Sequence, residues 1–192
     1  MLSGQQLTNS SSTNSRRAGD YYSTPEEATV ALLRVVNIHK SKIIWEPASG
    51  SGAITNILIR EGFGTVASDI APQMIAIERD FLTFLAPQGH WIITNPPFSL
   101  AGDFISHAFS LFDYGLEGFA MLLKSQFWHA SKRLALFRTT KPAMILPLTW
   151  RPDFLAGERG GSPVMEVAWT VWLRGHYGET RYIPVPRPGV RG

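Results

Sequence analysis

Short apolar runs without polar interruption recur along this chain, and helical patterns separate most of them. Such runs predict strands buried on both faces, which is typical of a largely parallel sheet covered by helices. Parallel strands need long crossover connections, and the intervening helical segments supply them. The expected strands are 42–45, 65–68, 81–85, 91–94, 119–123, 143–148 and 167–173. The expected helices are one that begins at Pro25, with Thr24 able to cap it, and those over 53–60, 73–79, 103–112 and 130–137.

The last two expected strands are joined by a glycine-rich segment with no helical pattern. Because a parallel strand would need a crossover helix there, we expect the final strand to run antiparallel. The sequence therefore predicts an α/β fold. Its Rossmann-like sheet would have seven strands, mostly parallel with an antiparallel last strand, and helices on both faces.

Composition narrows the classes of protein that fit. The chain has 192 residues, 44% hydrophobic and 17% charged, which is enough apolar material for the core of one domain. It shows no secretory signal, no cysteine, and no apolar run of the roughly 18 residues that a membrane-spanning helix needs. We therefore expect a cytoplasmic protein with no membrane contact and no disulfide. The net charge of +3 is compatible with a polyanionic partner.

Both ends of the chain predict flexible tails. Residues 1–19 are dominated by Ser, Thr, Asn and Gln, and residues 184–192 are rich in Pro, Gly and Arg. The single expected domain is 20–183. The histidines share no metal-ligand spacing, so no metal site is expected. They are His39, His90, His107, His129 and His176.

A glycine-containing loop, Glu46-Pro47-Ala48-Ser49-Gly50-Ser51-Gly52, follows an expected strand and opens a helix. Glycines at this spacing permit a tight turn and the close approach of a ligand, although a plain turn is the alternative. Glu46 would repel a pyrophosphate, and Thr55 stands where the dinucleotide fingerprint has its third glycine. Asp69, at the end of the next strand, can hold ribose hydroxyls. A nucleoside with positive charge and no phosphate fits, and S-adenosylmethionine is such a molecule.

A second motif, Asn95-Pro96-Pro97-Phe98, follows the strand 91–94. The Asn95 side-chain oxygen and the Pro96 carbonyl can accept both hydrogens of an exocyclic amine, which stabilises the positive charge that grows there on methyl transfer. The prolines hold these acceptors rigid, and Phe98 can stack on a flipped base. A rigid turn without chemistry is the alternative for this motif alone.

Together and in this order, the two motifs resemble those of class I S-adenosylmethionine-dependent methyltransferases. The form is similar to that of adenine-N6 DNA methyltransferases, especially the small phage and prophage enzymes, and the resemblance covers about residues 20–174. It implies the catalytic residues Asn95, Pro96, Pro97 and Phe98. It implies a cofactor site built from Tyr21, Tyr22, Thr24, Glu46, Pro47, Ala48, Gly50, Gly52, Asp69, Ile70, Asp80, Phe81 and Asn95. For Asp80, a solvated surface acid is the alternative.

Large members of that family add a target-recognition domain, whereas here only 18 residues follow Arg174. Specificity is therefore expected to come from loops, a second subunit in a homodimer, or a partner. Two loops, 124–133 and 151–163, combine basic and aromatic residues that suit phosphates and unstacked bases. The expected nucleic-acid contacts are Lys124, Phe127, Trp128, Lys132, Arg133, Arg151 and Arg159. Burial of Phe127 and Trp128 at the start of a helix is the alternative.

The sequence thus predicts methyl transfer from S-adenosylmethionine to the amino nitrogen of adenine in DNA. Two kinds of alternative remain. A methyltransferase could act on RNA bases or on a protein glutamine, although Phe98 favours a nucleobase. A catalytically inactive module could bind the cofactor and work by contact alone, although the intact motif at Asn95 argues against it.

Overall fold

The computed structural model describes residues 23–154 and 165–189. Its helices are α1 (Glu26–Val35), α2 (Ala53–Arg60), α3 (Ala101–Ser110) and α4 (Leu134–Thr139). Its strands are β1 (Ile43–Glu46), β2 (Gly64–Asp69), β3 (Ile77–Glu78), β4 (Trp91–Thr94), β5 (Gly118–Lys124), β6 (Met144–Pro147), β7 (Val167–Leu173) and β8 (Arg181–Tyr182). Short 3₁₀ helices are η1 (Phe81–Thr83), η2 (Leu111–Tyr114), η3 (Ser125–His129) and η4 (Ser131–Arg133).

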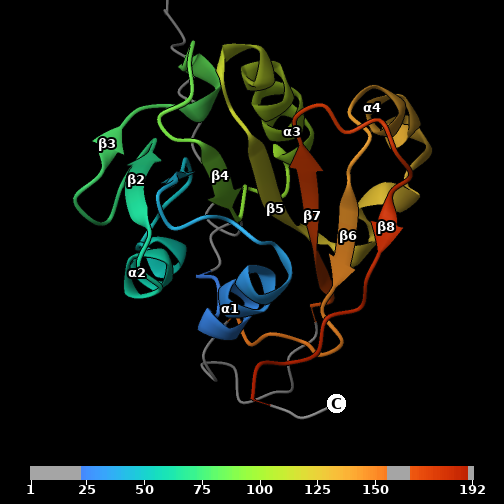
Figure 1. Cartoon of the computed structure of the whole chain (residues 1–192), viewed down its shortest axis with the longest axis horizontal. Coiled ribbons are helices and arrows are strands. Elements are labelled where there is room, and N and C mark those ends of the chain that lie inside the picture. Colours follow the sequence, from blue (N-terminus) through green and yellow to red (C-terminus); the bar gives the residue numbers. More distant parts are fainter. Residues whose placement is uncertain (1–22, 155–164, 190–192) are drawn as a thin grey trace, which may run out of the picture.

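The strands form one sheet in the order β3-β2-β1-β4-β5-β7-β6-β8, and Figure 1 shows β3 and β8 at its two edges. All neighbours are parallel except β7, which runs antiparallel to both β5 and β6. The predicted α/β, Rossmann-like sheet is therefore confirmed. It has eight described strands rather than seven, because the expected strand 81–85 does not form and the two-residue strands β3 and β8 are added at the edges. The antiparallel strand is β7, and β8 follows it, parallel to β6.

Each face of the sheet carries its own hydrophobic core. Neighbouring residues of β1 point to opposite faces, so Ile44 packs with Leu32 of α1 and Leu58 of α2. Trp45 belongs to the other core, with Ile105 of α3. This arrangement explains the uninterrupted apolar strands, because both of their faces are buried beneath helices.

Two predicted elements after β2 are wrong. Residues 73–79 do not form a helix, since the backbone N–H of Gln73 donates to Gly50 O at 3.1 Å and that of Arg79 to Asp69 O at 2.8 Å. These tertiary hydrogen bonds draw the segment along the neighbouring loop and strand. Residues 81–85 are not a strand, because Asp80 accepts a hydrogen bond from Leu82 N and starts η1. Phe81 and Phe84, three residues apart, then reach the same core.

The expected tail 184–192 is also corrected over the part that the structure describes, up to residue 189. Val185 is buried, its N–H donates to Pro147 O at 2.9 Å, and its carbonyl accepts from Thr149 N at 3.0 Å. The prolines on either side lack a donor, but the valine between them pairs at the sheet edge. The domain therefore extends beyond residue 183. The expected tail 1–19 lies outside the described residues.

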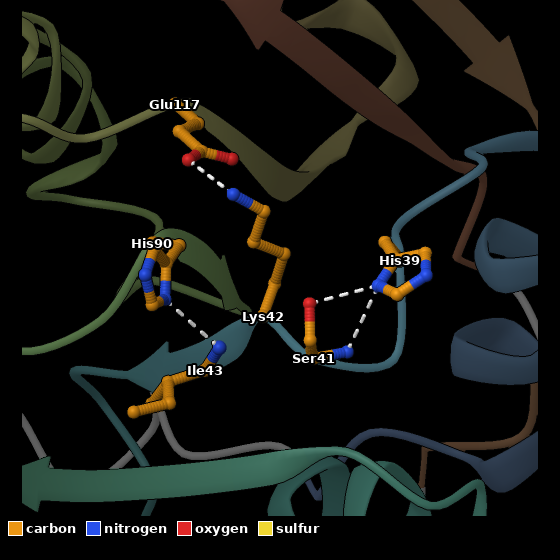
Figure 2. Close-up of polar contacts among 6 residues, drawn as sticks. All are labelled: His39, Ser41, Lys42, Ile43, His90 and Glu117. Carbon is orange, nitrogen blue, oxygen red and sulfur yellow. Dashed lines mark hydrogen bonds and ion pairs between the residues drawn. The ribbon is translucent and has the colours of Figure 1, made fainter.

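A polar cluster ties together the amino ends of the central strands (Figure 2). Lys42 forms an ion pair of 2.6 Å with Glu117, which precedes β5. His90, just before β4, accepts a hydrogen bond from the backbone N–H of Ile43 at 3.0 Å. His39 contacts Ser41 in the turn before β1, with 2.8 Å between Nδ1 and Oγ. His39 and His90 therefore have structural contacts at the edge of the sheet opposite the carboxyl ends of β1 and β4.

Candidate active site

The sheet has a topological switch point between β1 and β4. From β1 the chain moves outward to β2 on one side, whereas β4 and β5 lie on the other side. Ligands of open α/β sheets bind at the carboxyl ends of two neighbouring strands whose following connections run to opposite sides in this way. The loop 46–52 follows β1, and the motif 95–98 follows β4. Two motifs that are far apart in the sequence thus meet at one edge of the sheet.

The loop 46–52 has a backbone that only glycine adopts easily. Gly50 has φ +48° and Gly52 has φ +82°, both in the left-handed region. A Cβ on Gly52 would also overlap the sulfur of Met74. Hydrogen bonds from Ser49 N to Ser68 O at 3.1 Å and from Gly52 N to Ser49 O at 2.7 Å fix the turn. The glycines are therefore needed for the shape of the loop.

Glu46 is buried beneath this loop. One of its carboxyl oxygens accepts hydrogen bonds from the N–H of Thr55, at 2.7 Å, and from the Thr55 hydroxyl. Burial raises the pKa of Glu46 to about 8, the bonds from Thr55 oppose that rise, and the nearby charge of Asp69 adds to it. Thr55, which departs from the dinucleotide fingerprint, thus holds the buried acid at the start of α2.

Asp69 lies at the end of β2 and is fully buried. Its carboxylate accepts the backbone N–H of Gly50 at 2.8 Å and that of Ala71 at 2.9 Å. It therefore shapes the glycine loop directly, which the sequence did not indicate. Carboxylate oxygens have further lone pairs, so a role toward ribose hydroxyls stays a proposal. The next residue, Ile70, is 46% exposed and offers an apolar surface beside the loop.

Asp80 and Phe81 differ in what they can offer a ligand. Asp80 is half-buried and caps η1 through Leu82 N at 2.9 Å. The Phe81 ring is buried, edge-on to Trp45 at 5.2 Å and against His107 at 4.7 Å. Partial burial lowers the pKa of that histidine. Phe81 is thus a core residue, and its ring is not exposed to a ligand.

The motif 95–98 is anchored by Thr24. The Asn95 amide nitrogen donates to the Thr24 hydroxyl at 3.1 Å. Thr24 was expected to cap α1, but that helix has no side-chain cap, and Thr24 orients the catalytic candidate instead. With Nδ2 turned toward Thr24, Oδ1 is the acceptor end of the Asn95 side chain. Pro97 O then accepts from Leu100 N at 2.9 Å, which leads into α3.

The chemistry of the polar groups at this edge fits a cationic nucleoside. Asp69 and Asp80 supply carboxylates, and Glu46 adds a carboxyl group that keeps its proton at neutral pH because its pKa is raised to about 8, while the segments 46–52 and 94–98 contain no basic residue. Two hydroxyls that the sequence reading had not singled out, Ser49 Oγ and Thr94 Oγ1, are buried with no hydrogen-bond partner among the described residues. Buried hydroxyls normally have partners, so they are available for a polar ligand. The only signal in the sequence was their position, Ser49 within the first motif and Thr94 directly before the second.

The segment after β5 is only partly as expected. Phe127 is buried, with the Arg133 guanidinium 3.4 Å from its ring centroid. Trp128 is half-buried and packs edge-on against Phe127 at 4.8 Å and Phe137 at 5.3 Å. Because both rings pack against other side chains of this segment, we do not propose that bases stack on them. Lys132 is exposed.

Lys124, by contrast, lies beside the motif 95–98, with Nζ 4.5 Å from the ring centroid of Phe98. Arg151 is exposed and forms an ion pair of 2.7 Å with Glu166. The remaining predicted residues, Tyr21, Tyr22 and Arg159, lie outside the described residues.

In the described ranges 23–154 and 165–189, no helix has the length and apolarity needed to cross a bilayer. Within the same ranges, no group of three or more His, Asp or Glu side chains is placed to hold a metal ion.

Solved methyltransferases are similar in fold. A dimethyladenosine transferase from Plasmodium falciparum matches 80% of this chain and 63% of its own, with a TM-score of 0.61 and 13% identity. A protein of a type I restriction–modification system matches 93% of this chain and 48% of its own, with a TM-score of 0.62 and 14% identity. A protein from Pyrococcus horikoshii assigned as an RNA methyltransferase matches 80% and 86%, with a TM-score of 0.61 and 12% identity.

This chain has the class I S-adenosylmethionine-dependent methyltransferase fold. It spans less than two thirds of the Plasmodium and restriction–modification proteins. No protein-family model matches the sequence, and no curated protein does.

Proposed function

We propose that this protein transfers a methyl group from S-adenosylmethionine to the exocyclic amino nitrogen of adenine in nucleic acid, with DNA as the preferred substrate. One observation carries the proposal. Asn95, held by Thr24 through a 3.1 Å hydrogen bond, follows β4 directly across the switch point from the glycine loop. Methyl transfer to a base requires a hydrogen-bond acceptor for the target amine close to the loop that binds the cofactor, and both lie at one edge of the sheet.

The residues of the cofactor site have distinct proposed roles. When bound, S-adenosylmethionine supplies a methyl group on a positively charged sulfur. Asp69 and Ile70 would hold the ribose and adenine, and Asp80 the adenine amine. The carboxylates at this edge favour a cationic ligand, because opposite charges attract strongly where water is excluded.

The acceptor is activated by the motif 95–98. Asn95 Oδ1 and the Pro96 carbonyl would accept the two amine hydrogens of adenine, while Phe98 stacks on the ring. As the amine nitrogen would form its bond to the methyl carbon, the bond from that carbon to sulfur would break and leave its electron pair on a neutral thioether. The nitrogen would gain positive charge, and these oxygens would stabilise that charge. The extra proton on the nitrogen is then lost to water.

RNA is the second candidate substrate. The fold is similar to a dimethyladenosine transferase and to a protein assigned as an RNA methyltransferase, as well as to a restriction–modification protein. We favour DNA because the motifs 46–52 and 95–98 resemble those of adenine-N6 DNA methyltransferases.

The proposal is tested by single-turnover methylation of adenine-containing DNA and RNA with labelled cofactor, followed by nucleoside analysis. Asn95→Ala should reduce the rate by about 10²–10³, because it removes one preorganised acceptor of the transition state. Its cofactor affinity should fall far less than the rate, because the other residues of the proposed cofactor site remain. Asn37→Ala, at an exposed asparagine after α1, is the matched control. Full activity of Asn95→Ala, or a wild type that binds cofactor but methylates neither substrate, would sink the proposal.

A further inference from the structure

Lys124 and Phe98 come from neighbouring parallel strands. β4 pairs with β5 so that Thr94 lies opposite Met121. Phe98 is four residues beyond Thr94, and Lys124 is three residues beyond Met121, so both project from the carboxyl edge. The Lys124 ammonium lies over the Phe98 ring, 4.5 Å from its centroid. A cation thus covers one face of the aromatic ring in the catalytic motif.

The surroundings of Lys124 do not neutralise its charge. It is exposed, and it takes part in none of the ion pairs found between the described residues. Glu166 lies next to its β7 neighbour Val167, but the Glu166 carboxylate pairs with Arg151 at 2.7 Å. The contact with the Phe98 ring is therefore the one interaction that the described residues show for this ammonium.

This position has two consequences for a base that stacks on Phe98. The ammonium occupies a ring face that a planar base would need. It also brings a positive charge close to the place where the acceptor nitrogen becomes positive, and like charges destabilise each other. A substrate must therefore draw Lys124 off the ring before methylation becomes efficient.

We propose that Lys124 is a specificity-determining residue that makes methylation depend on a phosphate beside the target base. The inference rests on the proposed function. A phosphodiester oxygen accepts a charge-assisted hydrogen bond from the ammonium, which is stronger than the contact with the half-buried Phe98 ring. Binding of a nucleic-acid strand then moves the Lys124 ammonium from Phe98 to the phosphate and uncovers the ring face that the ammonium had occupied. Free adenine nucleosides have no phosphate, so Lys124 stays on the ring and excludes them.

The test compares kcat/KM for an adenine-containing oligonucleotide and for free deoxyadenosine. The variants are Lys124→Met, Lys124→Arg and the control Lys40→Met, an exposed lysine before β1 whose ammonium lies over the Phe63 ring, 3.7 Å from its centroid, at the opposite edge of the sheet. Lys124→Met should lose about tenfold on the oligonucleotide, which corresponds to one charge-assisted hydrogen bond. It should gain about two- to fivefold on deoxyadenosine, because the ring contact no longer competes. The preference for the strand should fall about twentyfold or more in Lys124→Met and stay unchanged in Lys40→Met.

Salt dependence gives a second readout that a purely structural lysine would not change. The slope of log affinity against log salt should become shallower by about 0.7–0.9 in Lys124→Met, since one phosphate contact is lost. Lys124→Arg keeps the charge and should retain both the slope and the preference.

The possible failures are distinguishable. If the preference and the salt slope are unchanged in Lys124→Met, the inference is overturned but the proposed function is not. The same holds if the wild type methylates deoxyadenosine as efficiently as the oligonucleotide. A wild type that methylates no nucleic acid overturns the proposed function, and this inference with it. If Lys124→Met does not fold, a loss of preference in Lys124→Arg, whose charge is intact, would overturn the inference.

Discussion

The buried carboxyl of Glu46 predicts an unusual dependence of stability on pH. Burial raises its pKa from 4.5 to about 8, so the folded protein binds this proton far more tightly than the unfolded chain. The stabilisation from the proton is complete below about pH 4.5 and is lost as pH rises through about 8. The free protein should therefore become less stable across neutral pH, and Glu46→Gln should remove that part of the trend.

The magnitude follows from the shift. Each pH unit between the two pKa values costs about 1.4 kcal/mol, so the full range amounts to roughly 5 kcal/mol. For a chain of this size, 1 kcal/mol changes Tm by about 2–4 °C. The melting temperature of the wild type should thus fall about 3–5 °C more per pH unit than that of Glu46→Gln. Near pH 8 the variant should be the more stable protein.

The assay is thermal melting without cofactor at intervals from pH 5 to pH 8.5. Glu61→Gln, at an exposed carboxylate just after α2, is the matched control and should follow the wild type. If plots of Tm against pH run parallel for the wild type and Glu46→Gln, the reasoning is refuted, because Glu46 then takes up no extra proton on folding.

Three further variants probe the site. Asp69→Asn should weaken cofactor binding at least about tenfold in calorimetry and lower Tm, because charge-assisted bonds to Gly50 and Ala71 are lost; unchanged affinity would remove Asp69 from the site. Phe98→Ala should raise the KM for nucleic acid by about 5- to 150-fold through lost stacking and leave cofactor affinity intact; unfolding would mark Phe98 as a core residue. Gly52→Ala should destabilise the protein more than Gly62→Ala, since both glycines have positive φ but only Gly52 faces Met74; equal losses of Tm would contradict this packing.

The fold was largely predictable because its signal is local. The strand 119–123 is apolar at every position, and burial on both faces follows from that pattern. The antiparallel direction of β7 follows from the missing helix before it. The segment 73–79 was not predictable, because hydrogen bonds to Gly50 and Asp69, distant in sequence, override its helical pattern.

Within the site, the sequence by itself determined which chemical groups are present and in what order. It supplied the glycines at 50 and 52 and the rigid acceptor motif 95–98. The sequence could not show whether Phe127 and Val185 are buried. An aromatic or Pro-flanked residue has the same local pattern whether it packs in a core or faces solvent.

Only the tertiary structure decided the partners of these groups. It turned Thr24 from a helix cap into the anchor of Asn95, placed Asp69 against the loop that it shapes, and set Lys124 over Phe98. It also raised the pKa of Glu46, which no local pattern encodes. The physical reason is common to all four. Hydrogen bonds, charge interactions and burial depend on distances between residues remote in the chain, and only packing of the sheet and its helices fixes those distances.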